Sequence, residues 1–541
     1  MSPMDAETVA GAFEAAATRW PARPVLNVLP ETAEVYGIPA GEIAYGAAAE
    51  RIAAQRAAFA AAGYVAGQRV MLLLENRPDF FLTWLALNGL GLSVVPVNPD
   101  LRAAELEYMI GHAEPAAAIA IASRVADLSA AAEAAGIAMP VVAPGDALPA
   151  PGRGPVCREP AAAEDREAAM LYTSGTTGRP KGCVLSNQYF LEAGRWYADA
   201  GGVCALSAEG ERMLTPLPIF HMNAMAYSFM AMVAVGGCLT ALDRFHPRTW
   251  WASVRESGAT CLHYLGVMPS MLMGLPEAPG DRDHAVRFGF GAGVDPKLHA
   301  AFERRFGFPL MEAWAMTETG AGAVVAANHA PRKVGVACFG RPGPELEVRI
   351  VGEDGADVAP GAPGELLVRR AGDDPRRGFF REYWRNPEET EAVWAGGWFH
   401  TGDVVRQDAD GSMTFVDRKK NVIRRSGENI AAVEVESVLM RHPGITAAGV
   451  AAVPDDIRGD EVFACLSVTG ARDEGAARAI VDWALTQMAY YKVPGYVAFV
   501  DALPLTATNK IQRGALKTLA AELLRDGRAV DTRGMKRRTA A

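Results

Sequence analysis

The chain has few cysteines for its length, and they follow no metal-binding or disulfide pattern. Its 541 residues include seven, which are widely spaced: Cys157, Cys183, Cys204, Cys238, Cys261, Cys338 and Cys465. No two stand in the C-x-x-C spacing of zinc and redox sites, and their odd number does not indicate a framework of paired disulfides. Reduced thiols in a cytoplasmic protein are therefore the expectation.

Positive charge is also scarce, because 53 lysines and arginines face 63 acids and give a formal net charge of −10. Such a balance gives no support to a nucleic-acid partner or an anionic membrane surface. Asp5, Glu7 and Glu14 interrupt the apolar residues at the start, so we expect no secretory signal. What remains is an ordinary globular composition, half hydrophobic, with the length of three or four domain-sized units.

One long run has no charged residue at all. From Met213 to Leu242 there is no Asp, Glu, Lys or Arg, which invites the prediction of a transmembrane helix. Pro216 and Pro218 lie within this run, Gly236 and its neighbour follow, and no aromatic or basic belt flanks it. We therefore expect a buried helix and strand in a large core, and no membrane span.

Predicted strands and helices alternate along much of the chain. Apolar runs typical of strands covered on both faces alternate with helical patterns, as in Gln68–Leu74 followed by Asn76–Leu90, and Pro296–Phe306 followed by Pro309–Trp314. This alternation predicts an α/β fold with largely parallel sheets. We expect two such subdomains, joined by a Pro- and Gly-rich connection over 143–165.

After Lys333 the pattern changes to alternating apolar residues, as in Leu346–Ile350, which indicates a small antiparallel, β-barrel-like unit over about 333–417. We assign 1–417 to a large N-terminal domain, and 418–421 to a charged hinge. A smaller, mobile α+β domain is expected over 422–525. The tail 526–541 is polar and basic, so we predict that it is disordered; a nucleic-acid arm is the less favoured alternative.

The stretch Leu171 to Gly182 is the strongest indication of function. It reads Leu-Tyr-Thr-Ser-Gly-Thr-Thr-Gly-Arg-Pro-Lys-Gly, and apolar residues before it predict a buried strand. Glycines allow a ligand to approach the backbone, and hydroxyls and cations suit a nucleotide's phosphates. The common G-x-x-x-x-G-K-[ST] loop is excluded by Pro180. The candidate phosphate ligands are Thr173, Ser174, Gly175, Thr176, Thr177, Gly178 and Lys181.

This stretch closely resembles the phosphate-binding signature of AMP-forming acyl-CoA synthetases and their adenylating relatives. A polar surface turn is the alternative interpretation of such a loop taken alone. The resemblance extends over roughly Ala6 to Leu519, with five separate motifs in the family's order. It implies a large N-terminal domain and a smaller C-terminal domain that pivots.

Two motifs of the resemblance concern adenine. Trp314-Ala-Met-Thr-Glu318 ends a predicted strand, where α/β sheets bind ligands. It resembles the family's aromatic-Gly-x-Thr-Glu motif, which implies that Trp314 stacks on adenine, Thr317 contacts the α-phosphate and Glu318 holds Mg²⁺. Gly291, Ala292 and Gly293 match the family's turn against adenine. A core tryptophan and a purely structural turn are the alternatives.

Further motifs follow toward the C-terminus. Thr401-Gly-Asp403 matches a family motif whose carboxylate binds the ribose hydroxyls, and an ionised acid can accept both hydrogen bonds. Arg418 aligns with the family's ribose-contacting arginine, and Lys420 with its hinge. The resemblance also implies that Gly427, Glu428 and Asn429 line the thiol tunnel after the pivot.

Lys510 aligns with the family's catalytic lysine. Thr508 and Asn509 stand where relatives usually carry Ser-Gly, which changes the loop more than the charge. Cys183 and Ser174 suggest a covalent nucleophile, but no histidine and acid partners can be identified by spacing, so we reject this interpretation. Electrostatic catalysis by Lys510, with Thr317 and Glu318, is the favoured hypothesis.

The acyl pocket is expected after Phe220, where the family often has a histidine and a gate. By this analogy His221, Met222, Asn223 and Met225 shape the pocket, and a satisfied core histidine is the alternative for His221. The segment is weakly similar to that of ligases acting on crotonobetaine, carnitine or related short acids. Methionine-rich walls are adaptable, so the acid itself is not predicted.

The implied reaction uses ATP, Mg²⁺ and coenzyme A. A carboxylic acid attacks the α-phosphate of ATP, and the thiol of CoA then replaces AMP. Within this class the acceptor could instead be a carrier-protein thiol, or the adenylate could be oxidised as in luciferases. From another class, a non-catalytic nucleotide-binding protein stays open. The sequence also leaves a homodimer open.

Overall fold

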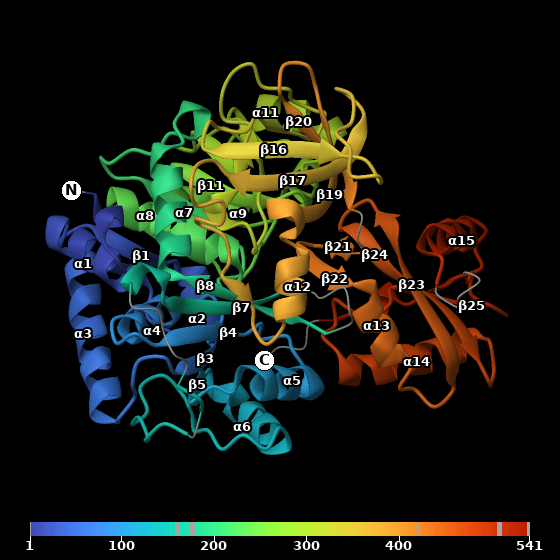
Figure 1. The fold of residues 1–541 in the computed structure, drawn as a ribbon, viewed down its shortest axis with the longest axis horizontal. Helices are drawn as coiled ribbons and strands as arrows, with labels where there is room; N and C mark the ends of the chain where they lie inside the picture. The colour runs from blue at the N-terminus through green and yellow to red at the C-terminus, as the bar shows by residue number, and fades with distance from the viewer. Residues whose placement is uncertain are drawn as a thin grey trace. The chain divides into compact units, whose positions relative to one another are not determined.

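The computed structural model describes residues 2–152, 154–156, 162–173, 179–418, 422–505 and 511–537, without the side chains of 267, 417 and 418. The chain divides into two compact units. The first comprises Met1–Pro99, Ile110–Leu171 and Gly182–Asp417, and the second Asp100–Met109, Tyr172–Lys181 and Arg418–Ala541. Figure 1 draws the C-terminal part of the second unit in orange and red.

An eight-stranded sheet forms the centre of the first unit. Its six middle strands are parallel, and one antiparallel strand closes each edge. The strands lie in the order β14 (Val325–Ala326), β13 (Leu310–Trp314), β12 (Phe288–Ala292), β11 (Cys261–Leu265), β9 (Arg212–Thr215), β10 (Cys238–Ala241), β1 (Pro24–Val28) and β2 (Gly41–Ala44). The carboxyl ends of β11, β12 and β13 therefore share one edge, where ligands bind in such sheets.

A second sheet of the same unit has seven strands, and its middle strands are also parallel. Their order is β18 (Glu382–Tyr383), β8 (Lys181–Ser186), β7 (Glu167–Thr173), β4 (Ser93–Pro96), β3 (Arg69–Leu73), β5 (Ala117–Ala120) and β6 (Val141–Val142). The apolar strands β3 and β4 are buried along their whole length, as the continuous apolar runs in the sequence predicted.

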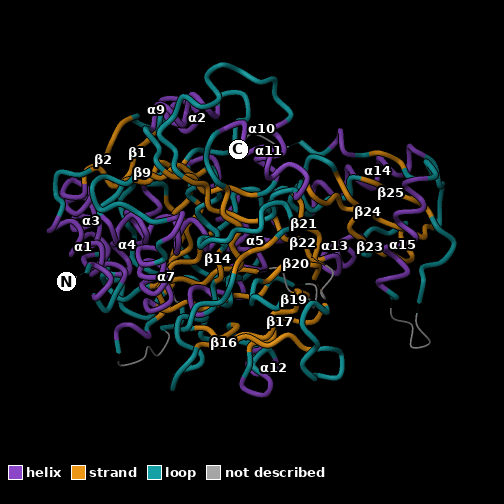
Figure 2. Tube along the Cα trace, turned by 90° about the horizontal axis from the view of Figure 1, so that it is seen from above, coloured by secondary structure: helices purple, strands orange, loops and turns teal. Residues whose placement is uncertain are grey.

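Helices cover both faces of the eight-stranded sheet. One group forms a shared core with both parallel sheets: α1 (Val9–Arg19), α3 (Tyr45–Ala61), α4 (Pro78–Asn88), α7 (Asn187–Asp199) and α8 (Met230–Val235). The other group packs on the opposite face: α9 (Trp250–Ser257), α10 (Val267–Met273) and α11 (Pro296–Phe306). In Figure 2 strands β1 and β9 lie between α9 and the group of α1, α3 and α4. The predicted α/β fold is confirmed.

Local sequence explains where these helices begin and end. Before α11 the Asp295 carboxylate accepts a hydrogen bond from the Lys297 amide, and Pro296 occupies the first turn. Gly307 ends the helix in a left-handed conformation with φ of 82°. Further helices are α2 (Pro30–Tyr36), α5 (Ala103–Ala113), α6 (Val125–Ala134) and α12 (Pro387–Ala392).

The uncharged run from Met213 to Leu242 is divided among four elements. It forms β9, a π-helix η5 (Asn223–Phe229), α8 and β10, which lie in the core of the first unit. None of the helices in the described part of the chain is both long enough and apolar enough to cross a membrane. The prediction of a buried helix and strand thus agrees with the structure.

A five-stranded antiparallel sheet completes the first unit, where the sequence predicted a small antiparallel, β-barrel-like unit. Its order is β15 (Cys338–Gly340), β20 (Met413–Arg418), β19 (Phe399–Gln407), β17 (Pro363–Arg370) and β16 (Leu346–Val351). Figure 1 shows β16 and β17 side by side in yellow. This sheet supplies Asp403 to the site described below.

The second unit contains a mixed sheet. It is built from β22 (Glu428–Ala431), β21 (Val422–Arg425), β24 (Gly459–Val468), β25 (Tyr496–Phe499) and β26 (Val530–Asp531), while β23 (Ile445–Asp455) pairs with β24. The helices of its C-terminal part are α13 (Ala432–Leu439), α14 (Glu474–Gln487) and α15 (Arg513–Arg525), which surround the strands in Figure 2. Apolar side chains of α15 pack on Phe463, Cys465 and Ala498 of the sheet.

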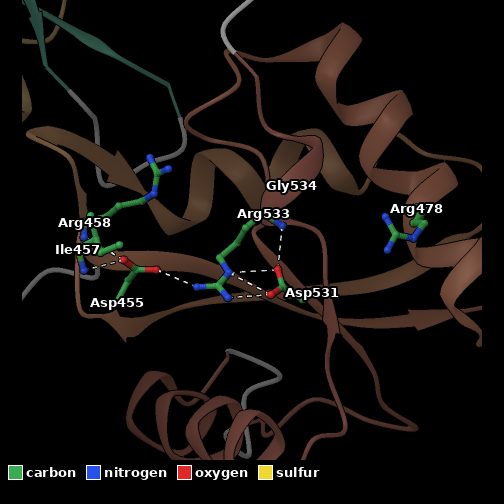
Figure 3. A pocket seen from close by; sticks show the side chains of 7 residues that line it. All are labelled: Asp455, Ile457, Arg458, Arg478, Asp531, Arg533 and Gly534. Carbon is green, nitrogen blue, oxygen red and sulfur yellow. Dashed lines mark hydrogen bonds and ion pairs between the residues drawn. The ribbon is translucent and has the colours of Figure 1, made fainter. Parts of the chain in front are cut away.

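The chain beyond α15 differs from the predicted disordered tail. Within 526–537, strand β26 pairs with β25 and is followed by a short 3-10 helix, η8 (Arg533–Met535). Lys536 is fully buried, and its Nζ lies 2.5 Å from Glu461 Oε1. Arg533 bridges Asp531 and Asp455 beside a surface pocket (Figure 3). Arg533 and Lys536 are thus paired with acids of the same unit, which charge composition alone could not indicate.

Candidate functional site

The turn after β12 holds the predicted Gly-Ala-Gly segment. Gly291 has no room for a side chain, because a Cβ there would lie 2.2 Å from the Tyr264 carbonyl oxygen. Gly293 adopts a left-handed conformation with φ of 82°, which glycine tolerates without strain. Strand pairing with β11 and the turn geometry therefore both require glycine here, and they expose backbone at the ligand-binding edge of the sheet.

Glu312, which the sequence reasoning missed, fixes this turn. Its carboxylate on β13 accepts hydrogen bonds from the amides of Gly293 (2.8 Å) and Val294 (2.9 Å) and from the Tyr264 hydroxyl (3.2 Å). Burial raises the pKa of Glu312, although these donors oppose that shift. An acid inside the apolar strand Leu-Met-Glu-Ala-Trp was the signal that could have identified it.

Trp314 and Asp403 meet although they belong to different sheets. Trp314 ends β13, Asp403 lies within β19, and Trp314 Nε1 donates a hydrogen bond to Asp403 Oδ2 over 2.9 Å. Trp314 is 6% exposed and Asp403 is 1% exposed. The sequence placed both in the same nucleotide site, and the structure brings these two side chains into direct contact.

The Thr-Gly-Asp motif is held as a fixed bend in β19. The Thr401 hydroxyl donates to the Leu366 carbonyl oxygen (2.7 Å) and accepts from the Asp403 amide (3.0 Å). Gly402 has φ of 69°, and its amide donates to Glu365 Oε1 over 3.1 Å. Because Thr401 and Gly402 are both anchored, the Asp403 carboxylate has a defined direction.

Thr317 and Glu318 follow β13 directly and are anchored by two tyrosines that the sequence reasoning missed. The Tyr189 hydroxyl donates to the Thr317 carbonyl oxygen, and the Tyr383 hydroxyl to Glu318 Oε1, each over 2.9 Å. Glu318 is 7% exposed. Burial and the Glu318 carboxylate raise the pKa of Tyr383, so its hydroxyl remains a donor. No sequence signal distinguished these tyrosines from core residues.

The predicted acyl-pocket residues lie at the start of η5. His221, Met222 and Asn223 are partly exposed, whereas Met225 is fully buried in the core. The Asn223 Oδ1 atom lies 2.9 Å from Nδ1 of His263 on β11. His263 was not predicted, although a histidine in the apolar strand Cys-Leu-His-Tyr-Leu could have been noticed.

Two predicted groups lie at the edges of the described residues. Thr173 ends β7 and Lys181 begins β8, while Ser174, Gly175, Thr176, Thr177 and Gly178 lie outside the described residues. Lys420 and Lys510 lie outside them too, as does the side chain of Arg418, whose backbone ends β20. The parts assigned to these residues stay predictions.

Gly427, Glu428 and Asn429 lie at a tight turn in the second unit. They follow β21 and begin β22, with φ of 50° at Ser426 and 92° at Gly427. The turn is tied to its own sheet, because the Ser426 amide donates to the Arg458 carbonyl oxygen (2.9 Å) and Arg425 pairs with Glu461 (2.8 Å). Gly427 and Asn429 are exposed, as residues that contact a ligand need to be.

Comparison with known proteins identifies similar chains over nearly the whole length. The family model described as AMP-binding enzyme matches residues 13–384, and that described as AMP-binding enzyme C-terminal domain matches 434–510. A crotonobetaine/carnitine–CoA ligase of Citrobacter koseri is 30% identical over 88% of this chain and 93% of its own.

Two solved structures are similar as well. An amide bond synthetase from Marinactinospora thermotolerans has a TM-score of 0.76 and 26% identity, over 94% of this chain and 99% of its own. A malonyl-CoA ligase in complex with methylmalonyl-CoA and AMP has a TM-score of 0.72 and 26% identity, over 89% of this chain and 96% of its own. The residues assembled here therefore lie in a fold shared with proteins that join acids to acceptors.

Proposed function

The chain belongs to the family of AMP-binding enzymes and is an acid–thiol ligase, and we propose that its described site binds the AMP moiety throughout two half-reactions. In the first, a carboxylate oxygen attacks the α-phosphate of ATP, an acyl-AMP forms and pyrophosphate leaves. In the second, the thiolate of CoA attacks the acyl carbon, a thioester forms and AMP leaves. The thiol proton passes to solvent, and no redox partner is needed.

The contact between Trp314 and Asp403 carries this proposal. The indole Nε1 holds Oδ2 of the carboxylate, and an ionised carboxylate accepts several hydrogen bonds, as the two hydroxyls of a ribose require. The glycine turn follows β12, the strand next to β13, and presents backbone to a flat ring. A tryptophan face and a ribose acceptor thus lie together at the edge where α/β sheets bind nucleotides.

Mg²⁺ fits the residues around Glu318. The described part of the chain has no group of three or more His, Cys, Asp and Glu side chains arranged to hold a metal ion. Mg²⁺ is usually bound through one or two carboxylates together with substrate phosphates, which a single oriented Glu318 satisfies. When bound, Mg²⁺ would neutralise phosphate charge; Tyr383 orients the carboxylate that would hold it.

The first half-reaction brings two anions together, so cations near the α-phosphate matter most. We assign that part to Lys510, with the residues between Thr173 and Lys181 around the outer phosphates. One ammonium about 4 Å from the reacting charge contributes about 4 kcal/mol at an effective dielectric constant near 20. That corresponds to roughly a thousandfold in rate. Lys420 as the hinge and Gly427–Asn429 as the thiol tunnel stay predictions.

The acid and the acceptor remain to be assigned. The Citrobacter koseri relative is named for crotonobetaine and carnitine, and the malonyl-CoA ligase structure holds methylmalonyl-CoA, so short acids with a second polar group are the first candidates. CoA is the favoured acceptor. A carrier-protein thiol is the alternative acceptor. The similarity to an amide bond synthetase makes an amine a further candidate acceptor.

Pyrophosphate release from the purified full chain tests the proposal. We expect release with ATP, Mg²⁺ and at least one acid of a panel of short, branched, aromatic and dicarboxylic acids. Lys510→Ala should slow this step about a thousandfold and spare thioester formation from a supplied acyl-adenylate. Lys297→Ala, which removes an exposed lysine of α11, is the matched control.

Two results would count against the proposal. Nucleotide binding without pyrophosphate release from any acid would favour a non-catalytic nucleotide-binding protein. Equal loss of both half-reactions in Lys510→Ala would contradict the part assigned to that lysine. Offering CoA, a carrier protein and a primary amine to the preformed adenylate identifies the acceptor.

A further inference from the structure

We propose that Asn223 and His263 together select the acid: they admit a short acid that bears a hydrogen-bond acceptor, and they disfavour longer apolar acids. This inference rests on the proposed function, because it places the acyl group at the start of η5. It goes further in naming the two residues that select such an acid.

His263 is held at both ring nitrogens. Nδ1 lies 2.9 Å from Asn223 Oδ1 and 2.8 Å from Ser228 Oγ, and Nε2 lies 3.0 Å from the Tyr197 hydroxyl. An amide oxygen only accepts, so Nδ1 donates to Asn223 and Nε2 accepts from Tyr197. Both ring nitrogens thus have partners, and the imidazole has a fixed orientation.

The imidazole also stays neutral. His263 is fully buried, and burial lowers the pKa of His263 to about 3. The ring is packed between Tyr197, at 5.5 Å between centroids, and Phe290, at 5.3 Å. Since neither protonation nor rotation is open to it near neutral pH, His263 keeps the Asn223 carboxamide in one orientation.

Asn223 marks the point at which the chain passes from surface to core. His221, Met222 and Asn223 are partly exposed, and all residues from 224 to 235 are buried. Asn223 Oδ1 is engaged by His263, whereas no described residue accepts a hydrogen bond from Asn223 Nδ2. An amide nitrogen donates only, so the group that matches it is an acceptor, such as a hydroxyl, carbonyl or carboxylate oxygen.

Register places this pair beside the adenine turn. His263 on β11 pairs with Phe290 on β12, and the next pair joins Tyr264 to Gly291. His263 therefore lies one strand from the Gly-Ala-Gly segment of the same sheet, and Asn223 contacts it from η5. An acid bound at this edge of the sheet, beside the nucleotide, would extend toward Asn223.

Aromatic rings fill the space behind the pair. The Tyr197 and Phe290 centroids are 4.8 Å apart, and both residues are at most 2% exposed. A longer alkyl chain would have to displace these rings and leave the His263 and Asn223 hydrogen bonds unmade, and unmade hydrogen bonds of buried polar atoms are unfavourable. The Tyr197 and Phe290 rings thus limit the length of the acid, and Asn223 favours an acid with a polar group.

The π-helix explains how one element supplies two hydrogen-bond partners to His263. Ser228 follows Asn223 by five residues, and its Oγ donates to the Asn223 carbonyl oxygen over 3.4 Å. A π-helix brings residues five apart into line, and such segments are frequent at functional sites. An ordinary α-helix would rotate one of the two away from the ring.

The test compares three acids on the full-length protein: 3-hydroxybutyric, butyric and hexanoic acid. The readout is kcat/KM for acid-dependent pyrophosphate release, expressed as the ratio of 3-hydroxybutyrate to hexanoate. We expect wild type to prefer the hydroxy acid, and Asn223→Leu and His263→Leu each to lower the ratio at least tenfold. His263→Gln, which keeps a donor and an acceptor, should restore part of the ratio.

His299→Leu is the matched control, because His299 is also buried and hydrogen-bonded, on α11, away from η5. It should leave the ratio within twofold of wild type. Circular dichroism establishes that each variant is folded. Should a leucine variant fail to fold, the wild-type preference decides, and equal or better use of hexanoate overturns the inference.

The outcomes separate the two proposals. Ratios within twofold of wild type in folded Asn223→Leu and His263→Leu would show that the network is packing only, and would overturn the selecting pair. Release with none of the acids, in the panel or in this set, would instead overturn the proposed function. A tenfold fall in both variants, with the control unchanged, supports the pair.

Discussion

Trp314 contributes both a ring face and a hydrogen-bond donor, and substitutions can separate the two. Its indole Nε1 donates to Asp403 over 2.9 Å in a buried setting. A hydrogen bond to a charged group contributes about 1.5–3 kcal/mol, more than a neutral one. The ring face should matter through stacking, which survives in phenylalanine and is lost in alanine.

We predict that Trp314→Phe weakens AMP binding about tenfold and that Trp314→Ala weakens it further, as measured by calorimetric titration of the full chain. Tenfold corresponds to about 1.4 kcal/mol, just below the range for one charged hydrogen bond. Trp250→Phe is the control, because Trp250 is buried on α9 and its Nε1 has no hydrogen-bond partner in the described part of the chain. Equal AMP affinity in wild type and Trp314→Phe would contradict the orienting contact.

The sequence predicted the residues that stand in motifs and missed those that support them. Trp314, Glu318 and Asp403 were predicted because local motifs fix their identity. Tyr383 contacts Glu318 from 65 residues away, and such a partner depends on the fold alone. Glu312 and His263 left weaker signals, each a polar residue within an apolar strand.

At the scale of elements, periodicity predicted ordinary helices and strands closely. The helix expected over Pro296–Phe306 is α11, which has these same bounds, and the strand expected over Gln68–Leu74 contains β3, Arg69–Leu73. The π-helix η5 was not predicted, since its five-residue repeat has no established sequence pattern. The ordered segment after α15 was missed because β26 is two residues long and depends on β25 for pairing.

The segment after α15 buries the side chain of Lys536, and this burial has a measurable effect on the free energy of unfolding. Lys536 is fully buried and pairs with Glu461, which also holds Arg425. Burial and the nearby Arg425 lower the pKa of Lys536 from 10.5 to about 7, although Glu461 opposes this. Between these two pH values the unfolded chain binds more protons than the folded one, so the contribution of Lys536 to the free energy of unfolding rises with pH.

We therefore predict that wild type gains thermal stability relative to Lys536→Met as the pH is raised from 7 to 9. The limit for one linked proton is about 1.4 kcal/mol per pH unit. Differential scanning calorimetry of both full-length proteins at each pH measures the effect. Lys517→Met, which replaces an exposed lysine of α15, should show no such trend. A difference in thermal stability between wild type and Lys536→Met that does not change with pH would contradict the lowered pKa of Lys536.

At the scale of the whole molecule, the sequence predicted the α/β class and a separate C-terminal part. It did not predict that Asp100–Met109 and Tyr172–Lys181 group with residues 418–541. These segments lie hundreds of residues from their partners, and no local pattern encodes such contacts. An example is Lys492, which is buried between Glu105 and Glu434 at 2.5 and 2.7 Å.

The central claim is that one carboxylate oxygen of the acid becomes bonded to the α-phosphorus of ATP. Acid labelled with ¹⁸O at the carboxylate, incubated with the full chain, ATP, Mg²⁺ and CoA, tests it most directly by mass spectrometry of the products. We predict AMP that carries one ¹⁸O atom for each acyl-CoA formed. Unlabelled AMP, or ADP with labelled phosphate, would contradict an acyl-adenylate and with it the proposed function.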